Sequence, residues 1–305
     1  MNNHNRQAGI GAFFGALGAA LQWRLLLLWL VVMALPTAIV ALPLWKTLSG
    51  LLDHSVHATA LAHTFDTLPM SDVIAQVGRH GDWLAGSNLG AIIVTLLASP
   101  FLTGMVVTAA RAPRSLMFGE LMHGGLSEYW RLLRLLLWAL LPFGVAFAIS
   151  GAASGMADKH AAAAVLESSA ASGSRIATIV TVVLLVLAHA MVESGRAQLV
   201  ADPMLRSATR AFFRGVGMLF RRPLATLGMY LGVSVIGYAI VLGLGMLRIR
   251  TDAVGLFGFI AALVVAQLIV AALAWQRTAR LFALGAVASA TPARRRAASP
   301  ALAAA

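Results

Sequence analysis

The chain has no cysteine, only 11 acidic residues, and only 11% charged residues in a length of 305. The absence of cysteine excludes disulfide bonds, thiolate metal sites and cysteine nucleophiles. Soluble domains carry about a quarter of their residues as charged side chains, which argues against a water-soluble fold of this size. Apolar residues are abundant instead, at 60% of the chain. The excess apolar surface is expected to face lipid.

Six apolar segments are long enough to cross a bilayer as helices, since a hydrocarbon core of about 30 Å takes roughly 20 residues. Helices are favoured because every backbone polar group must be satisfied inside lipid. The predicted fold is therefore all-α, with one six-helix membrane domain over residues 1–288 and a disordered basic tail over 289–305. The predicted spans cover residues 25–45, 89–110, 132–150, 176–192, 223–247 and 253–276.

Basic residues are concentrated in alternate connections between these spans. With the N-terminus in the cytoplasm, 17 of the 23 lysines and arginines fall on the inside. Such an excess marks the cytoplasmic side of a membrane protein, so both termini are predicted to be cytoplasmic. The formal net charge of +12 is accordingly interpreted as an orientation signal, and no nucleic-acid partner is predicted.

Residues 202–222 have the pattern of an amphipathic helix. Asp202 suits an N-cap and Pro203 suits the first helical position, and arginines then recur every four residues. This pattern predicts a helix in the cytoplasmic headgroup region, with anionic lipid as its partner. The predicted lipid contacts are Arg206, Arg210, Arg214, Arg221 and Arg222.

Short matches between the spans indicate an internal repeat. The Trp-Arg-Leu-Leu motif that begins at Trp23, before the first span, recurs at Trp130, before the third. A second interfacial segment is predicted at residues 113–122, where Gly124 and Gly125 are expected to break the helix. An interfacial helix followed by a two-helix hairpin, used three times, would explain this organisation.

The most distinctive polar residues lie at the cytoplasmic end of the fourth span. His189, Glu193 and Arg196 share one helix face because they are spaced by four and three residues. Ionisable groups at membrane depth are functional candidates by default, so these three residues are candidates for binding a ligand or a proton. A structural Glu193–Arg196 ion pair is the favoured interpretation. Gln267, in the sixth span, is a further candidate whose amide is expected to bond across helices.

Hydroxyl side chains cluster in the second span. Thr95, Ser99 and Thr103 lie beside Pro100, a combination that marks a broken helix at some transport sites. The same hydroxyls can instead bond to carbonyls that a proline leaves free. Matching breaks in both halves of the chain, which inverted-repeat transporters suggest, are not found.

Two further features carry weak signals. Gly228 and Gly232 form a small-xxx-small pair in the fifth span, which allows close helix contact within the chain or in a homodimer. His54 and His57 lie within helical reach of each other, and imidazole suits zinc or copper. No H-E-x-x-H pattern accompanies them, so solvated histidines are favoured, and no metal or other cofactor is predicted.

The sequence contains no phosphate-binding P-loop, no G-x-S-x-G motif and no pair of intramembrane carboxylates. An integral enzyme acting on lipids or envelope precursors would therefore lack a visible nucleophile or metal set. The favoured function is a non-enzymatic membrane scaffold or accessory subunit, with a membrane or cytoplasmic protein as partner. The alternative is a transporter or permease-like protein for a small solute or lipid, with His189, Glu193, Gln267 and the span-two hydroxyls as its polar set.

Three stretches carry a family resemblance. They are Tyr129 to Leu133, Glu193 to Arg196, and Phe213 to Leu227 with its Arg221-Arg222-Pro223 core. They resemble uncharacterised six-helix proteins of the bacterial inner membrane, and the layout is similar to the membrane domain found with some glycerophosphodiester phosphodiesterases. Where those relatives end span four in an Asp-Tyr-Ala-Arg-like stretch, this chain has Glu-Ser-Gly-Arg, which keeps an acid and a base at the same spacing. The resemblance implies a fold and supplies no catalytic residue.

Overall fold

The computed structural model describes residues 3–52, 71, 75, 78, 81–163, 167–253 and 255–298. Within these ranges the chain forms eight helices and no strand, which confirms the predicted all-α class. His54 and His57 lie outside the described residues. The helices are α1 Asn3–Ala19, α2 Trp23–Leu52, α5 Gly81–Arg111, α6 Phe118–Ala163, α7 Glu167–Ala201, α8 Ala208–Arg221, α9 Pro223–Ile249 and α10 Gly255–Ala298.

Six of these helices, α2, α5, α6, α7, α9 and α10, are long and apolar enough to cross a membrane. Five of them contain a whole predicted span and extend beyond it, whereas α10 begins at Gly255, two residues after the predicted start at 253, and extends beyond the predicted end. The third and fourth spans were predicted to end at residue 150 and begin at 176, whereas α6 continues to Ala163 and α7 starts at Glu167. Similarly, α10 is helical to Ala298, within the segment that was expected to be disordered. Alanine-rich sequence explains both extensions, because alanine has the highest helix propensity.

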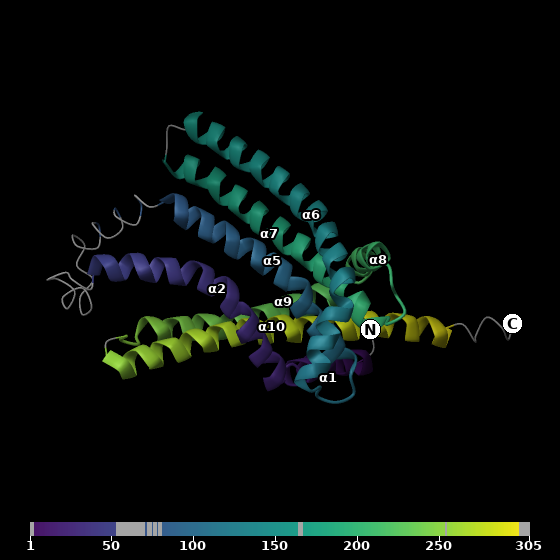
Figure 1. Cartoon of the computed structure of the whole chain (residues 1–305). Helices are drawn as coiled ribbons and strands as arrows, with labels where there is room; N and C mark the ends of the chain where they lie inside the picture. Colours follow the sequence, from purple (N-terminus) through teal and green to yellow (C-terminus); the bar gives the residue numbers. More distant parts are fainter. Residues whose placement is uncertain are drawn as a thin grey trace.

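Consecutive spans pair as three hairpins, α2 with α5, α6 with α7, and α9 with α10. Figure 1 shows these pairs diverging from one end of the molecule, where α1 and α8 also lie. The first and third hairpins each follow a shorter helix, α1 or α8, as the predicted repeat requires. Before the second hairpin, the predicted interfacial segment at residues 113–122 is non-helical up to residue 117 and joins α6 from Phe118 onward.

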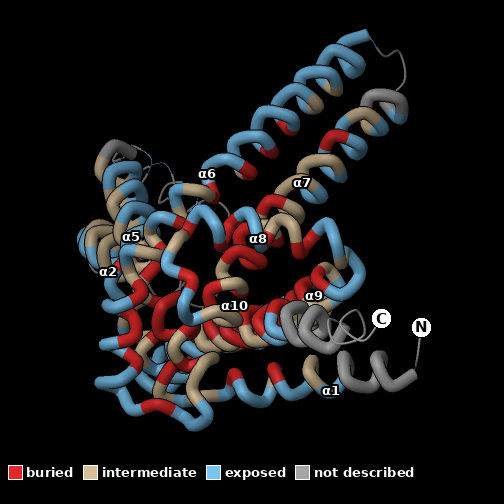
Figure 2. Tube along the Cα trace, turned by 90° about the vertical axis from the view of Figure 1, so that its right-hand side faces the viewer, coloured by how far each residue is buried: buried red, intermediate tan, exposed pale blue. Residues whose placement is uncertain are grey.

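The core lies where the helices converge. Leu25, Leu102, Met105, Leu121 and Leu284 are all at most 1% exposed and come from four helices. Figure 2 shows buried residues concentrated at this end, while the distal part of the α6–α7 hairpin is mostly exposed. Many large apolar side chains, chiefly Leu, Ile, Val and Phe, are exposed along the spans, which suits contact with lipid. The buried charged residues Glu128, Glu193 and Arg280 also lie at this convergent end.

Glycines allow the helices to approach closely at the convergent end. A Cβ on Gly124 would lie 2.6 Å from Thr108 Cβ, and a Cβ on Gly104 would lie 2.9 Å from the Gly125 carbonyl oxygen. Gly124 and Gly125 therefore seat α6 against α5. The prediction that they break the helix was wrong, since α6 runs through them without interruption. Packing against α5 outweighs the weak helix propensity of glycine here.

α8 begins later than its sequence pattern suggested. Ser207, not Asp202, is its N-cap, accepting a hydrogen bond from the Arg210 backbone N–H. Residues 203–207 precede the helix, so the predicted start at Pro203 was wrong. A Cβ on Gly215 would overlap the backbone of Ser194 and Gly195, so α8 crosses α7 where glycines meet. This crossing lies next to the acid and base of the fourth span.

Candidate functional site

Glu193 is the centre of a buried ionic network. It lies near the end of α7 that is predicted to face the cytoplasm. Its carboxylate is 4% exposed, and its Oε1 lies 2.8 Å from Arg196 Nη1. The predicted Glu193–Arg196 ion pair is therefore present. Arg280 of α10 and His189 of α7 each bring a side-chain nitrogen to 3.8 Å from the same oxygen. The network thus joins α7 to α10 as well as bridging one helical turn.

A layer of polar contacts with α9 holds this network in place. His189 Nδ1 lies 2.8 Å from the Tyr230 hydroxyl, and the Arg280 guanidinium lies over the Tyr230 ring at 5.2 Å. Arg280 Nη1 also donates to Ser234 Oγ at 3.3 Å. Gln276 Nε2 donates to the Ser234 carbonyl at 3.1 Å. We call these residues together the Glu193 cluster: His189, Glu193, Arg196, Tyr230, Ser234, Gln276 and Arg280.

Sequence reasoning found only the α7 members of this cluster. Tyr230 and Ser234 lie i,i+4 in an apolar span, and Gln276 and Arg280 lie i,i+4 at the end of another. This spacing was an available signal, because polar residues on one face of an apolar helix tend to meet a partner helix. Arg280 had been counted only as an orientation signal.

A second ionic network was not anticipated. Glu128 of α6 is 8% exposed, and its Oε1 lies 2.7 Å from Arg111 Nη1 of α5. Its Oε2 lies 2.7 Å from Arg131 Nη2, although these two atoms are not aligned as a hydrogen bond. Arg111 also donates to the Leu199 carbonyl of α7. We call Glu128, Arg111 and Arg131 the Glu128 cluster, which ties α5, α6 and α7 together.

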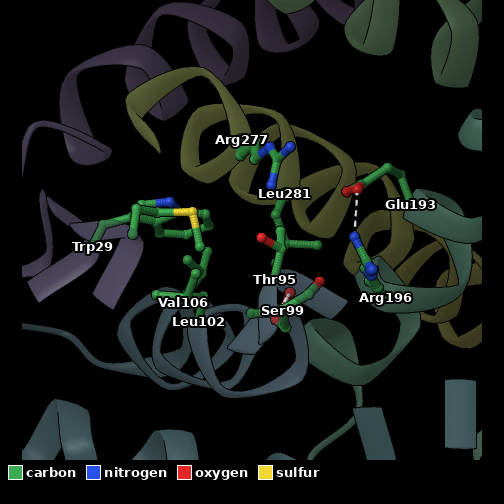
Figure 3. Close-up of a pocket in the computed structure, with 11 residues that line it drawn as sticks. Trp29, Thr95, Ser99, Leu102, Val106, Glu193, Arg196, Arg277 and Leu281 are labelled. Carbon is green, nitrogen blue, oxygen red and sulfur yellow. Dashed lines mark hydrogen bonds and ion pairs between the residues drawn. The ribbon is translucent and has the colours of Figure 1, made fainter. Parts of the chain in front are cut away.

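A small pocket lies beside the Glu193 cluster, with a volume of about 30 Å³. Figure 3 shows its polar walls: Arg277 of α10 on one side, Thr95 and Ser99 of α5 opposite, and the Glu193–Arg196 pair beside them. The side chains of Trp29 and Leu281 form an apolar part of the pocket wall. A water-sized sphere needs about 10–15 Å³, so the interior holds about two water-sized atoms.

The pocket brings together predicted site residues of α7 and of α5, but it does not include Gln267. Glu193 and Arg196 meet the α5 hydroxyls of Thr95, Ser99 and Thr103 across it. Thr95 and Thr103 donate to their own helix, to the Ala91 and Ser99 carbonyls, and so offer only acceptor lone pairs to the pocket. Gln267 lies about three turns away along α10, on an exposed position, and is not part of the site.

The predicted lipid-contact arginines lie on or beside α8. Arg206, Arg210, Arg214 and Arg221 are exposed, and Arg222 is half-buried. Arg214 pairs with Asp202 at 3.2 Å. The opposite face of α8 is buried against α7 and α6 through Ala208, Ala211, Phe212, Gly215, Met218 and Leu219.

Gly228 and Gly232, the predicted pair for close helix contact, have different surroundings. A Cβ on Gly232 would meet the Phe13 ring of α1 at 3.1 Å, so that glycine already accommodates a contact within the chain. Gly228 has open space around it. Among the residues that the structure describes, no group of three or more His, Asp or Glu side chains is placed to hold a metal ion.

The fold and these sites define a multi-pass helical membrane protein with two buried ionic networks and one polar pocket. No family model, curated protein or solved structure matches the chain.

Proposed function

We propose that the protein is a non-enzymatic scaffold or accessory subunit of the bacterial inner membrane, which binds anionic lipid headgroups along α8. The supporting observation is the composition of the exposed α8 face. Arg210, Arg214 and Arg221 lie there with two large apolar side chains, Phe213 at 58% and Phe220 at 68% exposure. Water disfavours such aromatic exposure, whereas the headgroup region accommodates apolar rings and cations together.

The position of α8 supports the same proposal. Trp138 Nε1 of α6 donates to Thr209 Oγ1 at 3.1 Å, and the Trp138 ring stacks on Phe212. These contacts fix which face of α8 is turned outward. The predicted orientation, with 17 of 23 basic residues inside, puts this face at the cytoplasmic leaflet, where anionic lipids attract arginine. The resemblance to six-helix bacterial proteins is the basis for naming the inner membrane.

The test compares lipid binding by two double variants of the full-length protein. Arg206→Gln with Arg210→Gln removes two charges from the α8 region, where neither side chain forms an ion pair with another described residue. Arg175→Gln with Arg250→Gln removes two exposed charges from the opposite end of the spans and serves as the matched control. Retention of phosphatidylglycerol over phosphatidylcholine is measured by native mass spectrometry from mixed-lipid nanodiscs.

Each arginine near an anionic surface contributes about 1 kcal/mol, so the α8 variant should lose roughly tenfold or more in its preference for phosphatidylglycerol. The control variant should keep the wild-type preference. Equal preferences in the wild type and both variants would show that α8 does not select anionic lipid.

A transporter is the second candidate, and the pocket is the observation that favours it. Thr95, Ser99, Glu193 and Arg196 come from helices α5 and α7 and border one polar cavity within the spans. Ionisable groups that line a cavity at membrane depth are typical of solute pathways. The scaffold is preferred because Glu193 is already engaged by Arg196, Arg280 and His189.

A further inference from the structure

Arg277 is the one cation of the pocket wall without a direct contact to the Glu193 carboxylate. It projects from α10 toward the α5 side of the cavity (Figure 3). No hydrogen bond or ion pair joins it to any other residue that the structure describes, and its side chain is accessible. Its neighbour Arg280 instead reaches Ser234 and the Glu193 carboxylate.

Charge around the pocket is unbalanced. Glu193 is the only carboxylate among the lining residues, and it already accepts from Arg196 at 2.8 Å. Among the lining residues, two guanidinium groups, those of Arg196 and Arg277, accompany this one carboxylate. The pocket wall therefore carries one positive charge in excess.

The pocket also offers hydrogen-bond donors. A guanidinium group has five N–H donors, of which Arg277 uses none on another described residue. Ser99, on the facing wall, makes no side-chain hydrogen bond within the described part of the chain, so its hydroxyl can donate into the cavity. Donors on two facing helices, with surplus positive charge between them, suit an oxygen-rich anion.

We propose that this pocket binds a phosphate group, held by Arg277 with Arg196 and Ser99. Arginine matches phosphate because two of its N–H groups can contact two phosphate oxygens at once. An interior of about 30 Å³ admits about two oxygen atoms, so two of the phosphate oxygens enter it, while the remaining oxygens and any substituent lie at the mouth. The group belongs either to an anionic lipid headgroup or to a free phosphate. This site is separate from the α8 face.

The experiment measures the thermal unfolding midpoint of the full-length protein in nanodiscs of phosphatidylcholine. In one arm, inorganic phosphate is titrated against chloride at constant ionic strength. In the other, phosphatidylglycerol replaces part of the phosphatidylcholine. A ligand that binds only the folded protein raises the midpoint with its concentration, which gives an apparent affinity.

Arg277→Gln is the test variant, and Arg134→Gln is its matched control. Arg134 is an exposed arginine of α6 outside the pocket and outside α8. Arg277→Gln breaks no ion pair, so it should fold as well as the wild type without phosphate. Charge-assisted hydrogen bonds are strong enough that its apparent affinity should fall at least about tenfold, whereas Arg134→Gln should match the wild type.

The two arms identify the source of the phosphate. Stabilisation by inorganic phosphate that depends on Arg277 indicates a free ligand, and stabilisation by phosphatidylglycerol that depends on Arg277 indicates a lipid. Absence of stabilisation in both arms, or equal responses of Arg277→Gln and Arg134→Gln, would overturn the proposal. If Arg277→Gln does not fold, Ser99→Ala decides: weaker binding supports the site and unchanged binding rejects it.

This outcome is independent of the α8 proposal. The Arg206→Gln and Arg210→Gln double variant should keep its full response to inorganic phosphate, because neither residue lines the pocket. Conversely, Arg277→Gln should keep the lipid preference that α8 confers. A failure at one site therefore leaves the other testable.

Discussion

The Glu128 cluster and the Glu193 cluster both place one glutamate among arginines, but the two clusters differ in geometry. Glu128 contacts two arginines at 2.7 Å, one on α5 and one on its own helix. Glu193 contacts one arginine at 2.8 Å and keeps Arg280 at 3.8 Å, with the pocket beside it. A carboxylate with its cations in direct contact serves to join helices. A carboxylate that lies beside a cavity and directly contacts only one of the surrounding cations leaves positive charge available to a ligand.

The first prediction is that Glu128→Gln is the more damaging of the two carboxylate replacements. It leaves both Arg111 and Arg131 without a counter-charge that each contacts directly at 2.7 Å. Breaking a buried pair by removing one partner costs about 3–5 kcal/mol of unfolding free energy. Thermal and denaturant unfolding in detergent should show this loss.

Glu193→Gln provides the comparison for that measurement. Its loss should be smaller, because Arg280 retains the Ser234 hydroxyl and the Tyr230 ring, and Arg196 borders the pocket. A loss for Glu128→Gln no greater than that for Glu193→Gln would show that the deeper burial of Glu193 and Arg280 outweighs the number of direct ion-pair contacts.

The sequence allowed the spans to be predicted because lipid demands about 20 apolar residues, whatever the contacts of those residues are. Glu193 and Arg196 could be paired because a spacing of three puts them on one helical face. Arg280 and Tyr230 could not be assigned to Glu193, since only the packing of α7, α9 and α10 brings them together.

The Glu128 cluster was missed for a related reason. Arg111 is separated from Glu128 by 17 residues, and it reaches Glu128 because Gly104, Gly124 and Gly125 let α5 and α6 approach closely. Gly124 and Gly125 were interpreted as a helix break from local propensity alone. A glycine that permits close helix packing and one that ends a helix have the same local sequence, and only the partner helix distinguishes them.

The second prediction separates the two functional candidates by a double-mutant cycle at Glu193 and Arg196. In a structural pair, Glu193→Gln and Arg196→Gln each leave an uncompensated charge, so each should lower stability, and the double variant should regain part of it. The coupling free energy should be about 0.5–3 kcal/mol, obtained from unfolding midpoints in detergent. Normal stability in both single variants would exclude a structural pair.

The same three variants also test the transporter alternative. Uptake of radiolabelled phosphate into liposomes should fail in each single variant without recovery in the double, if these residues bind cargo directly. Recovery of function together with stability in the double variant would instead assign both effects to the fold.

The smallest effect is predicted for Arg114 and Glu120, an ion pair outside both clusters. Arg114 Nη2 lies 2.6 Å from Glu120 Oε1, and the Glu120 carboxylate raises the pKa of Arg114, but both side chains are exposed. Arginine is charged at neutral pH without this help, so the raised pKa adds no pH dependence there. Exposed pairs are screened by solvent and salt, and many contribute nothing measurable.

Glu120 also accepts a hydrogen bond from the backbone, so the effects of its charge and of its hydrogen bonding can be tested separately. Its Oε2 accepts from the Met117 backbone N–H at 2.7 Å, in the manner of a capping box at the start of α6. Glutamine can make that contact without the charge, and alanine cannot. Glu120→Gln should therefore unfold at the wild-type midpoint, while Glu120→Ala should show a small decrease. A decrease in Glu120→Gln that approaches the loss in Glu128→Gln would mean that burial does not govern how strongly these ion pairs stabilise the fold.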